Sequence, residues 1–305
     1  MKTDATNHVV PTPDRRPALE GRPVRDPFEA QLALARRGIA CGPLDGSMGM
    51  QTRAAIQIFQ QYEGLPVTGA LDLATRETLR LHGETYGWFT VTQADVQGLA
   101  SMPSSWLGKS QMDRLGYETI LEQVAEYSHA HPALIRKLNP SIEWSRVGAG
   151  ASIRIPKAEY LPVRSRASLV RISLSQRHLR AFDDDGVLLC FFPCSIAHRV
   201  DKRPIGDLKV EVVIKDPDYT FNPEVFPESS EARELKRKLV LKPGPNNPVG
   251  VAWIGLSRSG YGIHGTPSPE AVGRTESHGC FRLANWNADY LRQLVSVGTP
   301  VTVEP

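Results

Sequence analysis

The sequence predicts a multidomain α+β protein in which helical units precede a β-rich unit. The chain has 305 residues, a length typical of about two domains and sufficient for three. Before Pro162, apolar residues recur at helical spacing, as in residues 55–62. After Pro162 they alternate with polar residues, as in residues 170–174, which is typical of a half-buried strand.

Composition and charge exclude several classes of protein. The chain carries 36 Lys plus Arg against 33 Asp plus Glu, a formal net charge of +3, which argues against nucleic acid as a dedicated partner. Hydrophobic residues make up 41 %, enough to build cores. The longest apolar run is residues 249–256. A membrane-spanning helix needs roughly 20 such residues, so we expect no membrane span.

The four cysteines, Cys41, Cys190, Cys194 and Cys280, form no CxxC pair. Their number and spacing fit neither a disulfide scaffold nor a zinc ribbon. On a fully extended strand the Cα atoms of Cys190 and Cys194 would lie ~13 Å apart, beyond the ~7 Å that a disulfide allows. We therefore expect both to be core thiols.

After a flexible leader over residues 1–25, a helical module is expected over residues 26–83, with helices near 28–37, 55–62 and 72–81. The motif Pro-Leu-Asp-Gly at 43–46 has a counterpart 23 residues later, Pro-Val-Thr-Gly, and each copy indicates a turn followed by a helix start. The pattern resembles the three-helix peptidoglycan-binding module of cell-wall enzymes. The alternative is a generic small helical bundle.

A connector over residues 84–112 is followed by a second small unit over residues 113–158. An amphipathic helix follows Tyr117, a second helix starts at Pro132, and a short strand ends at Pro156. This order resembles the βααβ LysM module, which implies binding of glycans that contain N-acetylglucosamine. A purely structural spacer is the alternative.

Residues 163–305 are expected to be mainly antiparallel β, with peripheral helices near residues 228–239 and 287–297. Two motifs here carry chemistry, His264-Gly265 and Ser277-His278-Gly279-Cys280, and they place two histidines and one cysteine within 17 residues. A histidine can take the proton of a cysteine thiol and lower its pKa by forming an ion pair. Glycine at 279 would let backbone N–H groups approach a developing oxyanion.

This constellation resembles the L,D-transpeptidases of the YkuD type, and the resemblance extends from Ser168 to Glu304. It implies that Cys280 is the nucleophile and that His264 is the general base, oriented by the carbonyl of Gly265. The backbone amides of His278, Gly279 and Cys280 would bind the oxyanion. Ser277, Arg282 and Tyr261 would bind the substrate. An alternative use of His264, His278 and Cys280 is zinc binding, which no further metal-ligand motif supports.

The resemblance implies an acyltransferase that acts on peptidoglycan tetrapeptide stems and forms 3→3 cross-links through a Cys280 thioester. It implies no cofactor and no metal. Water as acceptor would make the enzyme an L,D-carboxypeptidase, and an amine of another protein would make it an anchoring enzyme. A non-catalytic wall-binding scaffold is the alternative outside enzymology.

Expected partners are peptidoglycan stems and glycan strands, with a covalently attached wall protein under the anchoring alternative, and the enzyme is expected to act as a monomer. We expect an extracytoplasmic location, in the periplasm or cell wall. The first residues lack an apolar segment, so the expectation includes a signal peptide that is absent from this sequence.

Overall fold

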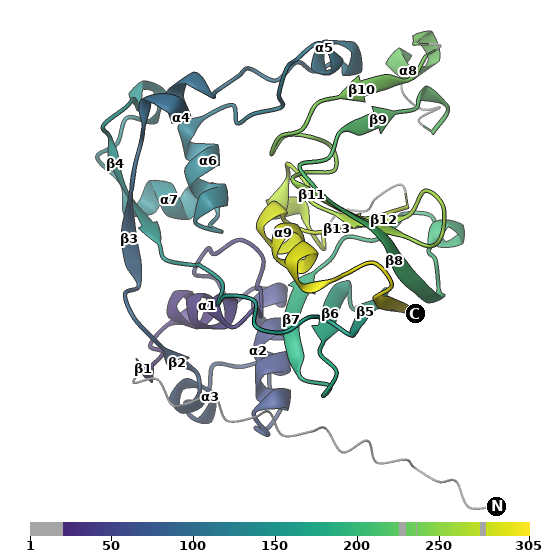
Figure 1. The fold of residues 1–305 in the computed structure, drawn as a ribbon. Coiled ribbons are helices and arrows are strands. Elements are labelled where there is room, and N and C mark those ends of the chain that lie inside the picture. Colours follow the sequence, from purple (N-terminus) through teal and green to yellow (C-terminus); the bar gives the residue numbers. More distant parts are fainter. Residues whose placement is uncertain (1–20, 226–229, 236, 275–278) are drawn as a thin grey trace, which may run out of the picture.

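The computed structural model describes residues 21–225, 230–235, 237–274 and 279–305. It confirms a multidomain α+β architecture, with helical units before a β-rich domain (Figure 1). Among the described residues, none of the helices combines the length and apolar character needed to cross a bilayer.

The first unit contains three helices and a two-stranded sheet: β1 (Arg22–Pro23), α1 (Pro27–Arg36), α2 (Met50–Tyr62), α3 (Leu73–Thr78) and β2 (Arg80–Leu81). The helix predicted over 72–81 is too long, because Leu79 adopts an extended backbone and the next two residues pair with β1. The predicted leader also extends too far. Arg22 within it forms β1 and donates two hydrogen bonds to the buried carboxylate of Glu29.

The internal repeat is a pair of turns, each held by a buried glutamine. The Gln31 amide bonds the backbone of residues 45–47 and the Thr52 hydroxyl. The Gln60 amide bonds residues 68–70 and the Thr75 hydroxyl in the same pattern. The partners of the two glutamines differ by 23 positions throughout, the repeat seen in the sequence.

The middle unit contains β3 (Tyr86–Thr90), α4 (Gln93–Gln97), α5 (Trp106–Ser110), α6 (Ile120–Tyr127), α7 (Pro132–Leu138) and β4 (Ser152–Pro156). Strands β3 and β4 pair antiparallel around α6 and α7, which gives a βααβ unit. The partner of β4 therefore lies inside the predicted connector, before residue 113. The insertion between β3 and α6 carries α4 and α5.

The last unit is built on an eight-stranded mixed sheet in the order β13-β12-β11-β8-β14-β5-β6-β7. The strands are β5 (Leu169–Ser173), β6 (His178–Phe182), β7 (Leu188–Pro193), β8 (Gly206–Lys215), β11 (Ala252–Leu256), β12 (Gly262–His264), β13 (Phe281–Arg282) and β14 (Pro300–Glu304). Helix α9 (Asn285–Leu294) packs against β11 and β8. Its inner face joins a core that contains Val170, Ile254 and Phe281.

A separate hairpin projects from this sheet beside α5 (Figure 1). It consists of β9 (Tyr219–Phe221) and β10 (Leu239–Leu241), with α8 (Ser230–Glu234) between them. The helix predicted over 228–239 is therefore wrong at its end, where buried Leu239 and Leu241 flank exposed Val240 with the period of a strand. Trp106 of α5 stacks on Phe221, with the ring centroids 4.3 Å apart.

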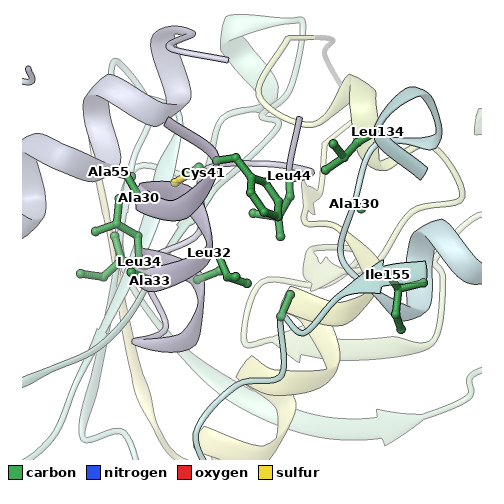
Figure 2. Packing of buried hydrophobic residues seen from close by; sticks show 14 of the residues in the cluster. Ala30, Leu32, Ala33, Leu34, Cys41, Leu44, Ala55, Ala130, Leu134 and Ile155 are labelled. Carbon is green, nitrogen blue, oxygen red and sulfur yellow. The ribbon is translucent and has the colours of Figure 1, made fainter. Parts of the chain in front are cut away.

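The three units share hydrophobic packing. One cluster of buried side chains includes Leu34 and Leu44 of the first unit and Ala130 and Ile155 of the middle unit (Figure 2). Phe191 of β7 belongs to the same cluster. Residues 38–40 also run parallel to β7, since Phe191 N donates to Gly38 O and Ala40 N donates to Phe191 O. The first unit thus covers the edge of the large sheet.

Candidate active site

The site forms where β12 and β13 pair in parallel. Ile263 pairs with Phe281 and His264 with Arg282. Because side chains alternate across a sheet, Ile263 and Phe281 enter the core, while His264 and Arg282 share the opposite face. Cys280 directly precedes β13, and the charges of Cys280 and Arg282 act on each other.

His264 is buried, with 4 % of its surface exposed. Its Nδ1 lies 2.6 Å from Gly265 O. A carbonyl can only accept, so Nδ1 carries the proton and Nε2 is free to act as a base. The ring stacks on Trp253, with centroids 5.6 Å apart. Burial lowers the pKa of His264 to about 4, so the imidazole is neutral at pH 7.

All four cysteines lie within the described residues, and Cys280 alone among them is not buried. Cys190 and Cys194 are buried free thiols, as predicted, and Cys41 is a third. The Cys280 Sγ lies 3.6 Å from Gly260 O. Burial raises the pKa of the Cys280 thiol, against the opposing effects of a hydrogen bond with the Gly262 backbone and the charge of Arg282. These shifts favour an uncharged thiol and an uncharged imidazole over the ion pair expected from the motif.

Backbone hydrogen bonds fix the position of Arg282, and its guanidinium brings positive charge to the site. Its N–H and carbonyl each bond the backbone of Ser195 at 3.0 Å, and the Ser195 hydroxyl accepts from Gly273 N at 2.9 Å. Burial lowers the pKa of Arg282. Burial raises the pKa of Tyr219, at the start of β9, to about 12, and the charges of Cys280 and Arg282 also act on it.

Tyr261 and Gly279 lie beside each other, since a methyl group at Gly279 would lie 3.7 Å from the Tyr261 ring. Arg258 covers the Tyr261 ring, with its guanidinium carbon 4.8 Å from the ring centroid. Ser277 and His278 lie outside the described residues. Within the described ranges no group of three metal-ligating side chains occurs. One of the three ligands in the zinc alternative, His278, lies outside those ranges.

Sequence reasoning missed three residues that shape this site: Tyr219, Trp253 and Asn285. Trp253 belongs to a predicted strand, but the run 249–256 is apolar throughout and does not show which side chain faces His264. Asn285, 1 % exposed, begins α9 and lies against Gly265. The sequence signal for Asn285 was its position between the apolar residues Ala284 and Trp286, close to the start of the helix expected near residues 287–297.

Residues 167–303 match the family model described as L,D-transpeptidase catalytic domain. Residues 26–79 match the model described as "Putative peptidoglycan binding domain". A Bacillus subtilis protein named "Putative L,D-transpeptidase YkuD" is 42 % identical over 190 residues, which cover 60 % of this chain and 92 % of the relative.

This chain belongs to the YkuD family of L,D-transpeptidases. A Bacillus licheniformis relative of the same name is 28 % identical over 191 residues, covering 62 % of this chain and 94 % of the relative. Among solved structures, L,D-transpeptidase 3 from Mycobacterium tuberculosis is 17 % identical, with a TM-score of 0.36, over 52 % of this chain and 77 % of that chain. Membership of the family makes the β-rich unit an acyltransferase domain.

Proposed function

We propose that this chain is a cysteine L,D-transpeptidase acting on peptidoglycan tetrapeptide stems, with Cys280 as nucleophile and His264 as general base. The observation that carries the proposal is the pairing of β12 with β13, which sets His264 opposite Arg282, two residues after Cys280, while Gly265 O engages the Nδ1–H of His264. A base oriented in this way beside a partly exposed thiol is the arrangement that nucleophilic acyl transfer requires.

In the first half-reaction the Cys280 sulfur attacks the carbonyl that joins the third residue of the stem to its terminal D-Ala. The thiol proton passes to His264 Nε2 as the S–C bond forms. Backbone N–H groups of His278, Gly279 and Cys280 stabilise the oxyanion. The C–N bond then breaks, D-Ala leaves with the proton from His264, and a thioester remains on Cys280.

In the second half-reaction the side-chain amine of a diaminopimelate in another stem attacks the thioester. His264 takes a proton from the amine and returns it to the Cys280 sulfur, which leaves as the thiol. The product is a 3→3 cross-link. The energy comes from the peptide bond that was broken, so the reaction needs no nucleotide. Ser277, Tyr261 and Arg282 line the donor site, with Arg282 supplying positive charge for a carboxylate of the stem.

The remaining units are proposed to bind the cell wall. The match of residues 26–79 to a peptidoglycan-binding model supports this role for the first unit. The βααβ arrangement of β3, α6, α7 and β4 supports a LysM-like role for the second. A wall substrate implies an extracytoplasmic location. We propose that the enzyme acts as a monomer.

Acylation of Cys280 by a carbapenem tests the proposal. The wild type should gain the mass of one carbapenem in intact-mass spectrometry, and Cys280→Ala should gain none because the attacking sulfur is missing. His264→Ala should be acylated at least 100-fold more slowly, within the range of a general base's contribution. A Cys280→Ala variant that is acylated at the wild-type rate would refute the assignment of the nucleophile.

Muropeptide analysis with defined tetrapeptide substrates identifies the acceptor. Cross-linked dimers that require Cys280 support the proposal. Release of D-Ala without dimers would instead establish an L,D-carboxypeptidase, and label transferred to a protein amine would establish an anchoring enzyme. A wild type that is not acylated but still sediments with isolated cell wall would establish a binding scaffold.

A further inference from the structure

The turn that orients the catalytic base is held by the side chain of Asn285. A methyl group added to Gly250 or to Gly265 would overlap Asn285 Oδ1, so the amide fills the space between these two glycines. Asn285 Oδ1 also accepts from Val251 N at 3.3 Å. Gly265 O accepts the hydrogen bond that orients the His264 ring. If Asn285 were displaced, Gly265 could move, and the imidazole would lose its fixed orientation.

Asn285 is in turn held from outside the catalytic domain. Its Nδ2 donates to Pro245 O at 3.1 Å and to Glu126 Oε2 at 3.0 Å. Glu126 belongs to α6 of the middle unit, 159 positions away in the chain. The carboxylate therefore forms a hydrogen-bonded connection from the LysM-like unit to the support of His264.

Glu126 has its own support within the middle unit. The Tyr117 hydroxyl donates to Glu126 Oε1 at 3.0 Å, so each carboxylate oxygen accepts one hydrogen bond. Burial, together with the charges of Glu122 and Glu270, raises the pKa of Glu126 to about 7, against the hydrogen bonds from Asn285 and Tyr117, which lower it. Arg114 lies near Tyr117 and acts on its hydroxyl. After protonation the carbonyl oxygen can still accept from Asn285 and the Tyr117 hydroxyl can accept from the new O–H, so the connection does not depend on the negative charge.

We propose that Glu126 is a positioning residue of the transpeptidase site: through Asn285 it fixes Gly265 and hence His264, so the wall-binding half of the chain completes the catalytic half. The inference rests on the proposed function, because it assigns Glu126 a part in the work of His264. Glu126 itself touches none of the reacting atoms.

The test measures carbapenem acylation of the intact chain under saturating conditions. Glu126→Ala removes the acceptor of Asn285 Nδ2, and we expect the maximal acylation rate at pH 8 to fall about tenfold, since small misplacements of catalytic groups cost this much or more. The half-saturating carbapenem concentration should stay unchanged, because Glu126 does not touch the donor site. Iodoacetamide alkylation of Cys280, which needs no base, should also stay unchanged.

Glu126→Gln separates positioning from charge. The amide oxygen can still accept from Asn285, so the maximal rate at pH 8 should lie within twofold of wild type. A protonated Glu126 keeps the same acceptor oxygen for Asn285. The ratio of the wild-type rate to the Glu126→Gln rate should therefore stay constant as the pH passes through about 7, where Glu126 gains a proton.

Glu122→Ala is the matched control, one turn earlier on α6. Its carboxylate bonds Asn246 at 2.7 Å across the same interface but does not bond Asn285. A tenfold loss in Glu126→Ala with a near wild-type rate in Glu122→Ala supports the proposal. Equal losses in both alanine variants, an unaffected Glu126→Ala, or a tenfold loss in Glu126→Gln would each overturn it. A wild type that is never acylated would instead overturn the proposed function.

Discussion

At the scale of single residues, burial favours the uncharged forms of the proposed nucleophile and the proposed base. Burial lowers the pKa of His264 to about 4 and raises that of Cys280. Arg282 contributes in both cases, because its charge disfavours an imidazolium and favours a thiolate. Proton transfer from sulfur to Nε2 must then accompany the attack on the carbonyl rather than precede it.

The first prediction concerns the pH dependence of Cys280 alkylation by iodoacetamide. Only the thiolate reacts, and a raised pKa means that the rate at pH 7 should be lower than that of an exposed thiol, whose pKa is about 8.5. The rate should climb with pH beyond that value. His264→Ala should change this profile little, because a neutral imidazole gives the thiolate no charge.

Arg282→Gln should shift the alkylation profile of Cys280 to higher pH, since the guanidinium lowers the thiol pKa. Cys280→Ala supplies the blank, because the remaining cysteines are at most 5 % exposed. Mass spectrometry of the alkylated chain gives the rates. A rate that is already maximal at pH 7, and that drops in His264→Ala, would show a preformed ion pair and contradict the prediction.

The sequence was sufficient to nominate Cys280, His264 and Gly265 because they lie in two short motifs with defined chemistry. It did not reveal Tyr219 or Glu126. Each of these acts on the site across a contact between segments that are far apart in the chain. No local pattern marks such a residue, since its partner is set by how the units pack.

At the scale of elements, the peptidoglycan-binding unit depends on two buried glutamines. Gln60, 0 % exposed, accepts from the N–H groups of Thr68 and Gly69 at 2.9 and 2.8 Å and donates to the Thr75 hydroxyl at 2.8 Å. These bonds fix the turn between α2 and α3 against the end of α2. The helices are short, so such turns set their relative positions.

The second prediction is that Gln60→Ala destabilises the protein by about 2–4 kcal/mol, because buried backbone donors lose their acceptor and a cavity forms. Chemical denaturation followed by circular dichroism measures the change. Gln61→Ala is the control, since Gln61 is the exposed neighbour in the same helix and should change stability by less than about 0.5 kcal/mol. Equal effects of the two substitutions would disprove the role of the glutamine.

Element prediction succeeded where capping and periodicity agreed. Asp72 caps α3 as expected, its side chain accepting from Thr75 N, and Gly64 follows α2 with a φ of 68°. It failed at residues 80–81 and at residue 239, where pairing with another strand overrides the helical pattern. The short strand β3 was missed for the same reason, because β4, its partner, comes more than sixty positions later.

At the scale of the whole molecule, the three units contact one another near the site and are not independent modules. Glu126 of the middle unit makes one contact with the catalytic domain. The first unit makes another, because Gln51 Nε2 of α2 donates to Val272 O, in the segment before Cys280, at 2.7 Å. The connector holds the hairpin that carries Tyr219, because Glu231 of α8 accepts from the first two N–H groups of α5, both at 2.9 Å. Three non-catalytic segments therefore contact the surroundings of the site.

The last prediction follows from the edge of the large sheet. In the intact chain Phe191 is 2 % exposed, and residues 38–40 bond the outer side of β7. Gly38 suits this approach because its φ is 78° and a methyl group there would lie 2.7 Å from Leu189 O. A chain reduced to residues 163–305 loses this cover, and an uncovered edge strand pairs with other copies. We expect it to form oligomers that light scattering after size exclusion detects.

A chain that starts at residue 21 is the matched control for this truncation, because it keeps every contact between the described units and should elute as the intact chain does. The catalytic domain alone should also melt at a lower temperature, since it loses the cluster that joins Phe191 to the first two units. It should acylate more slowly as well, because Glu126 is gone. A truncated domain with the size, melting temperature and acylation rate of the intact chain would show that the units are independent, and that the interfaces contribute neither stability nor catalytic geometry.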